Sequence, residues 1–193
     1  MKSILLILIV AFAGTACTCC NSAPLFSPEN DDSWTLFQFS QDADIRGWAV
    51  EDDAVMGGSS KGRFFINEAG NAIFSGDLSL ENKGGFSSVK YSFPLVRVSA
   101  CQAIVLGLKG DGKRYQLRVE STPKGPHAYA ADFETSGDWQ TIEIPFADLH
   151  AIHHGDWLDL PGYPGKTMSG IQLLISTGKA ESFQLEMDRI WLK

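Results

Sequence analysis

The chain has 193 residues, of which 44% are hydrophobic and 11% aromatic, and 23 Asp and Glu against 16 Lys and Arg give a formal net charge of −7. This length matches one domain with a sizeable core, and the plentiful aromatic and aliphatic residues exclude a disordered chain. The acidic balance excludes a nucleic-acid-binding protein, because such a protein needs a clustered excess of Lys and Arg.

The chain begins with a predicted signal peptide, residues 1–16. Lys2 precedes an apolar run over residues 4–13, which is shorter than the about 20 apolar residues of a membrane-spanning helix. Three small residues then lead into Cys17, a pattern that resembles a bacterial lipobox, in which the cysteine after the cleavage site is lipidated. We therefore expect an exported lipoprotein of the cell envelope, anchored at Cys17 and facing the periplasm or the exterior. Lipidation at Cys19, or ordinary cleavage and secretion, is the alternative.

Residues 17–33 are small, polar and contain proline, so they are predicted to be a tether between the membrane and a domain at residues 34–193. Three of the four cysteines lie at the start of this tether, which leaves Cys101 as the one cysteine of the domain. A framework of disulfides within the domain is therefore excluded.

From Trp34 onwards, apolar and polar residues alternate with a period of two, which is typical of half-buried strands. The clearest case is residues 113–120, where Tyr115, Leu117 and Val119 are predicted to point to one side of a sheet. Further strands are predicted at residues 34–39, 63–67, 72–80, 86–93, 101–109, 127–133, 139–144, 170–176 and 183–188.

Glycine-rich turns separate these strands, and the turn at residues 110–112 predicts a hairpin between its two flanking strands. A short helical turn is predicted only at residues 145–151. Ten or so short strands without alternating helices indicate an all-β fold, an antiparallel β-sandwich.

The most distinctive motif lies in residues 47–65. It consists of Trp48, then Asp53-x-Val-Met-Gly-Gly-x-Ser60, then the aromatic Phe64. This pattern resembles the complex I intermediate-associated protein family, which is named for a thirty-kilodalton mitochondrial assembly factor of the respiratory NADH:ubiquinone oxidoreductase and has bacterial relatives. The likeness extends from about residue 37 to about residue 190, through segments 74–80, 84–89, 108–115 and 139–146.

The resemblance implies a galactose-binding-domain-like β-sandwich of the jelly-roll type, which several carbohydrate-binding modules share. It also implies a chaperone-like assembly role rather than an enzyme. We therefore expect a non-enzymatic module that binds a protein partner in the cell envelope. A carbohydrate-binding module is the alternative, and a hydrolase whose carboxylates the sequence does not reveal is a third hypothesis.

The candidate binding residues lie in the motif and in one later strand: Trp48, Asp53, Met56, Gly57, Gly58, Ser60 and Trp139. The two glycines are expected to supply a positive φ or a close approach of other groups, and Met56 to fill an irregular gap. Trp48 and Trp139 could form a sugar-stacking platform, but strand tryptophans usually lie in the core, which we favour.

Asp53 is expected to accept hydrogen bonds from backbone N–H groups of the glycine turn, with Ser60 bracing the same loop. A calcium ion held by Glu51, Asp52 and Asp53 is the alternative.

The sequence contains no known catalytic motif, neither a nucleophile elbow nor a Walker loop, Cys-x-x-Cys or His-Glu-x-x-His. His150, His153 and His154 lack an established zinc-ligand spacing and are expected in a solvated loop. We therefore expect no enzymatic activity, no cofactor and no bound metal ion.

Overall fold

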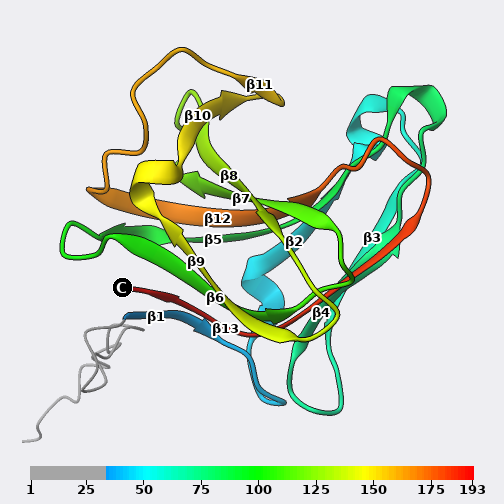
Figure 1. Ribbon diagram of the computed structural model, residues 1–193, viewed down its shortest axis with the longest axis horizontal. Coiled ribbons are helices and arrows are strands. Elements are labelled where there is room, and N and C mark those ends of the chain that lie inside the picture. Colours follow the sequence, from blue (N-terminus) through cyan, green and yellow to red (C-terminus); the bar gives the residue numbers. More distant parts are fainter. Residues whose placement is uncertain (1–33) are drawn as a thin grey trace, which may run out of the picture.

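The computed structural model describes residues 34–193, which form two antiparallel sheets packed face to face (Figure 1). The predicted signal peptide, the tether and Cys17 lie outside these residues. Strands dominate the part described, and its helices are short 3-10 turns. None of them is long and apolar enough to cross a membrane. The all-β sandwich predicted from the alternation is therefore confirmed.

The first sheet has six strands in the order β3-β4-β13-β6-β9, with β1 also paired to β13. Its strands are β1 (Trp34–Gln38), β3 (Lys61–Ile66), β4 (Ala72–Asp77), β6 (Ala103–Lys109), β9 (Trp139–Pro145) and β13 (Ser182–Leu192). All of its pairings are antiparallel.

The second sheet has seven strands in the order β11-β10-β8-β7-β12-β5-β2. Its strands are β2 (Trp48–Asp52), β5 (Ser87–Arg97), β7 (Arg114–Glu120), β8 (Ala128–Glu134), β10 (His150–His153), β11 (Asp156–Trp157) and β12 (Thr167–Ile175). The connections contain the 3-10 turns η1 (Ile45–Gly47), η2 (Asp53–Met56), η3 (Glu81–Lys83) and η4 (Phe146–Asp148). η4 falls within the predicted helical turn.

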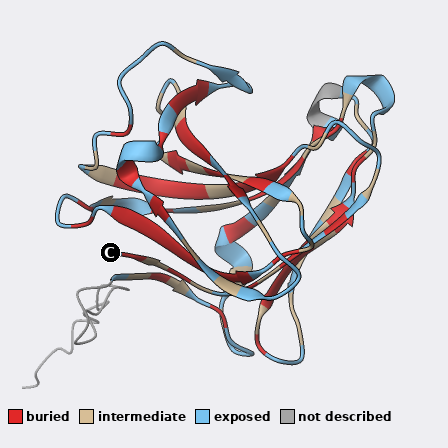
Figure 2. Cartoon of the chain, viewed as in Figure 1, coloured by how far each residue is buried: buried red, intermediate tan, exposed pale blue. Residues whose placement is uncertain are grey.

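Buried residues lie along the strands of both sheets (Figure 2), and on several strands they alternate with more exposed ones. The buried side chains form one hydrophobic core. On β7, Tyr115, Leu117 and Val119 are buried, and the residues between them are more exposed, as predicted. Burying a side chain the size of leucine contributes about 1.5–3 kcal/mol. The inner faces thus hold the sheets together, and the loops and outer faces are available to contact other molecules.

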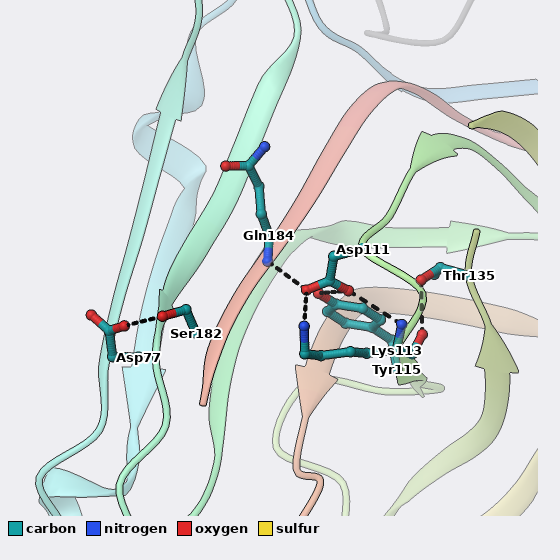
Figure 3. Close-up of polar contacts among 7 residues, drawn as sticks. All are labelled: Asp77, Asp111, Lys113, Tyr115, Thr135, Ser182 and Gln184. Atoms are coloured by element: carbon teal, nitrogen blue, oxygen red, sulfur yellow. Dashed lines mark hydrogen bonds and ion pairs between the residues drawn. The ribbon is translucent and has the colours of Figure 1, made fainter. Parts of the chain in front are cut away.

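The hairpin predicted at residues 110–112 is wrong. This turn carries the chain from β6 in one sheet to β7 in the other, because β6 pairs with β9 and β13, and β7 with β8 and β12. The Asp111 carboxylate holds the crossing by accepting hydrogen bonds from Lys113 Nζ at 2.9 Å and the Tyr115 hydroxyl at 3.1 Å (Figure 3). It also accepts the backbone N–H of Gln184 on β13 at 2.9 Å. Alternation on both sides of a turn predicts two strands but does not determine whether they pair.

The solvated loop predicted around the histidines is also wrong in part. His150 and His153 are the exposed ends of β10, and the two residues between them, Ala151 and Ile152, are buried. His154 follows in a turn with φ +50°. β10 is too short to show a recognisable period, so tertiary packing rather than local pattern makes it a strand.

Candidate functional site

Asp53 is the buried centre of the signature segment, with a side chain that is 0% exposed. Its Oδ1 accepts the backbone N–H of Ser60 at 3.0 Å, and its Oδ2 accepts the Ser60 hydroxyl at 2.5 Å. Oδ2 also accepts the backbone N–H groups of Gly85 at 2.6 Å and Phe86 at 3.3 Å. The predicted role of Asp53 as a backbone acceptor, with Ser60 bracing it, is confirmed. One carboxylate joins two loops that are about thirty residues apart in the chain.

The ionised form of Asp53 is stabilised where it lies. Burial raises the pKa of this carboxyl, but hydrogen bonds from Ser60, Gly85 and Phe86 lower it by more, so that its pKa lies below the ordinary value of 3.8. The carboxylate is therefore charged at neutral pH and draws its compensation from fixed N–H and O–H donors.

Glycines allow the two loops to close on Asp53. Gly57 has φ +87°, the left-handed region, where it ends η2. A Cβ atom on Gly58 would lie 2.3 Å from the Asp53 carboxyl carbon, and one on Gly84 would lie 2.4 Å from Oδ2. The glycines thus supply both the positive φ and the close approach that the sequence predicts.

Gly57→Val is expected to lower the free energy of unfolding by about 1–3 kcal/mol. The added Cβ has free space around it, so the cost comes from forcing a β-branched residue to φ +87°. Thermal and denaturant unfolding measure the effect. Gly137→Val is the control, because Gly137 has neither a positive φ nor a neighbour within 4 Å of an added Cβ. Equal melting temperatures for the two variants would contradict the expectation.

We call residues 53–60 and 79–86 together the double loop. Its second half contains Asn82 and Lys83, two consecutive non-glycine residues with φ of +53° and +64°. The Asn82 side-chain amide donates to the carbonyl oxygen of Gly57 at 2.9 Å, which links the two halves at the surface. Leu80 is 46% exposed beside them. Below this surface, the Asp53 carboxylate fixes the backbone of both halves.

The three acidic residues of the motif do not converge. Asp52 accepts the backbone N–H of Gly62 at 2.9 Å and the Ser87 hydroxyl at 2.6 Å. Glu51 is exposed on the outer side of β2, and Asp53 is enclosed by its own donors. In residues 34–193, no three His, Cys, Asp or Glu side chains gather in a way that could hold a metal ion. The arrangement therefore gives no support to the calcium alternative.

The two tryptophans proposed for a stacking platform lie apart. Trp48 is 8% exposed and stacks with Tyr91 at 4.9 Å and Phe64 at 5.0 Å between ring centroids. Trp139 is 47% exposed at the start of β9, in the other sheet. The core location is confirmed for Trp48 and wrong for Trp139, and the two cannot form one platform. The Met56 side chain lies outside what the structure describes.

The outer face of the seven-stranded sheet is a second polar feature, which sequence reasoning missed as a site. The sequence does carry a signal for this face. The polar residues between Tyr115 and Glu120 alternate with the core residues of the same strand, so they must point outward. Antiparallel register places the outward residues of five strands in two cross-strand rows. The rows are Asp132, Gln116, Leu174, Ser88 and Glu51, and Ala130, Arg118, Gln172, Lys90 and Ala49.

Hydrogen bonds connect these outward side chains across the strands. Gln116 Nε2 donates to Asp132 Oδ1 at 2.8 Å, and Arg118 Nε donates to Gln116 Oε1 at 2.6 Å. On the next pair of strands, Gln172 Nε2 donates to the Ser88 hydroxyl at 2.9 Å. The polar groups of this face are thus held in fixed positions, which favours recognition of a ligand with matching donors and acceptors.

Comparison with protein families matches residues 37–187 to the family described as complex I intermediate-associated protein 30. The match spans the whole signature segment and most of the domain. A search of curated proteins finds no significant match.

Among solved structures, the fold is similar to a family 11 carbohydrate-binding module from Clostridium thermocellum in complex with a β-1,3-1,4-mixed-linked tetrasaccharide. The identity is 18% and the TM-score 0.59, over 83% of this chain and 94% of that chain. The fold is also similar to the family 11 module of the cellulase Lic26A-Cel5E from the same organism. There the identity is 16% and the TM-score 0.58, over 81% of this chain and 92% of that chain. For the agarase AgWH50C, the identity is 12% and the TM-score 0.57, over 83% of this chain and 24% of that chain. These identities show the fold alone, a jelly-roll β-sandwich.

Proposed function

The chain belongs to the complex I intermediate-associated protein 30 family, and we propose that it is a non-enzymatic binding and assembly module whose double loop binds a protein partner in the cell envelope. The observation that carries this proposal is the buried Asp53 carboxylate, which holds both halves of an exposed loop through four hydrogen bonds. The family signature thus serves to hold a surface in one shape.

The shape of the double loop requires strained backbone conformations. Asn82 and Lys83 occupy left-handed backbone conformations, which cost about 1–3 kcal/mol each outside glycine and persist where the surrounding structure enforces them. Such strained positions gather at functional sites. Leu80 supplies an exposed apolar side chain beside them, and its burial by a partner would be favourable.

Site-specific photo-crosslinking in intact cells tests this proposal. A photoreactive amino acid is placed at Leu80 and, in a matched culture, at Leu160, which is 49% exposed and lies outside the double loop. A discrete crosslinked protein is expected from position 80 and not from position 160. Identical products from both positions, or none from position 80, would contradict it.

The proposed location is the cell envelope, with a lipid on Cys17 as the membrane anchor. It rests on the apolar run and the lipobox-like residues before Cys17. Palmitate labelling should mark the wild-type protein and not Cys17→Ala. Equal labelling of both proteins would remove the anchor from the proposal.

Carbohydrate binding is a second candidate function. The specific observation in its favour is the hydrogen-bonded outer face of the seven-stranded sheet, on a jelly-roll fold that a carbohydrate-binding module shares. This function would use a different surface from the double loop, so one chain could carry both.

A further inference from the structure

We propose that the outer face of the seven-stranded sheet binds a neutral glycan chain, with Arg118, Gln116 and Gln172 as hydrogen-bonding groups and Trp157 as a stacking surface at the margin. This inference rests on the second candidate function and names the site and the ligand class for it.

At the centre of this face, small side chains lie between long ones, which cover them. Ala130 and Ser88 are fully buried, although both belong to outward-pointing rows, and Gly170 stands opposite Glu120 in register. At one end, β10 and β11 stand on the side of the sheet away from the six-stranded sheet (Figure 1). The long polar side chains therefore form the surface that a ligand would contact.

Arg118 is the strongest indication of a ligand. Its side chain is half-buried, and this desolvation lowers the pKa of the guanidinium. Of its five N–H donors, the one on Nε bonds to Gln116 at 2.6 Å. The four on the terminal nitrogens have no hydrogen-bond partner in residues 34–193, and no carboxylate there lies within 4.0 Å of them. These terminal donors are open to solvent and so available to acceptors on a ligand.

The charges of the face favour a neutral ligand. The positive side chains of the face nearly balance the negative ones, and Lys90 is paired with Glu120 at 2.5 Å. The positive residues are Arg114, Arg118 and Lys90, and the negative ones are Glu51, Glu120, Asp132 and Glu134. The chain as a whole carries −7, which disfavours a polyanion. Amide groups that both donate and accept match sugar hydroxyls, which do the same.

Trp157 provides an apolar surface at the β11 edge of the same sheet. It is 52% exposed, and its register partner Ile152 pairs in turn with Ala128, so Trp157 lies on the outer face. The His150 ring packs edge-on against the indole at 6.4 Å between centroids. An exposed tryptophan on the same face as fixed hydrogen-bonding groups suits a glycan chain, whose sugar rings have apolar C–H faces and polar edges.

Calorimetric titration of the full chain with soluble β-1,3-1,4-mixed-linked glucan, together with a screen of neutral and uronic-acid glycans, tests the proposal. We expect binding to a neutral glycan. Trp157→Ala should weaken it at least about tenfold, as truncation of an aromatic anchor does. Arg118→Lys should weaken it also, because the ammonium keeps the charge but loses the planar fork. Trp139→Ala is the matched control, with a similarly exposed tryptophan on the other sheet, and should leave affinity unchanged.

Unchanged melting temperatures show that the variants remain folded. Neutral-glycan binding that Trp157→Ala and Arg118→Lys leave intact would overturn this site while carbohydrate binding itself would stand. Binding confined to uronic-acid glycans would overturn the ligand class. No binding to any glycan would overturn both this site and the second candidate function, and would leave the proposal for the double loop untouched.

Discussion

Asp53→Ala is expected to lower the free energy of unfolding by about 3–5 kcal/mol. The substitution leaves the Ser60 hydroxyl and the N–H groups of Ser60, Gly85 and Phe86 without their acceptor in a buried site. An unpaired buried donor costs about 1–3 kcal/mol, and these four share one carboxylate, so their costs combine without adding fully. Urea unfolding followed by tryptophan fluorescence measures the loss.

Asp42→Ala is the control for this substitution, because Asp42 is exposed. A surface change of this kind usually alters stability by no more than about 0.5 kcal/mol. A loss below about 1 kcal/mol for Asp53→Ala would show that the carboxylate does not hold the two loops together.

Gly58→Ala is expected to cost about 2–3 kcal/mol. Its Cβ would lie 2.3 Å from the carboxyl carbon of Asp53, so the buried carboxylate would have to move away from its four donors. Gly137→Ala is the matched control, since nothing lies within 4 Å of an added Cβ there. A stability equal to that of the control would contradict the close packing.

A double-mutant cycle separates this clash from other effects. In an Asp53→Ala background the carboxylate is gone, so the added methyl group has room. Gly58→Ala should then cost much less than in the wild type. Costs that add would mean that the two residues act independently.

The strands were predictable where the local pattern carries the burial. Tyr115, Leu117 and Val119 alternate with polar residues, and this period alone determines which side faces the core. β10 was not predictable, because two buried residues between histidines form no period. The pairing of β6 and β7 with other strands follows from the crossing that Asp111 holds, a contact with β13 that no local pattern contains.

The candidate site was predictable in part for the same reason. A short acidic residue followed by two glycines indicates a backbone-capping turn, and Asp53 forms one. The donors from Gly85 and Phe86 lie in a distant segment, so the sequence showed a turn but not the link between two loops. The different locations of Trp48 and Trp139 likewise depend on which sheet each strand joins.

Acid should destabilise the wild-type domain more than Asp53→Asn. The folded-state pKa of Asp53 lies below the ordinary value of 3.8, so the native state binds fewer protons than the unfolded chain in this range. The stability from this group is complete above that value and is lost as the pH falls through the folded-state pKa. Unfolding free energies between about pH 6 and pH 3 should therefore fall more steeply for the wild type. Parallel curves would argue against an ionised Asp53.

The pKa of Asp53 shows most directly whether one buried carboxylate stays charged and holds the double loop. Carbon-13 NMR titration of its side-chain carboxyl measures this value in the folded protein. A pKa below 3.8 is predicted, since the donors of Ser60, Gly85 and Phe86 outweigh the effect of burial. A pKa above 3.8 would mean that burial dominates, and would contradict the role assigned to the signature.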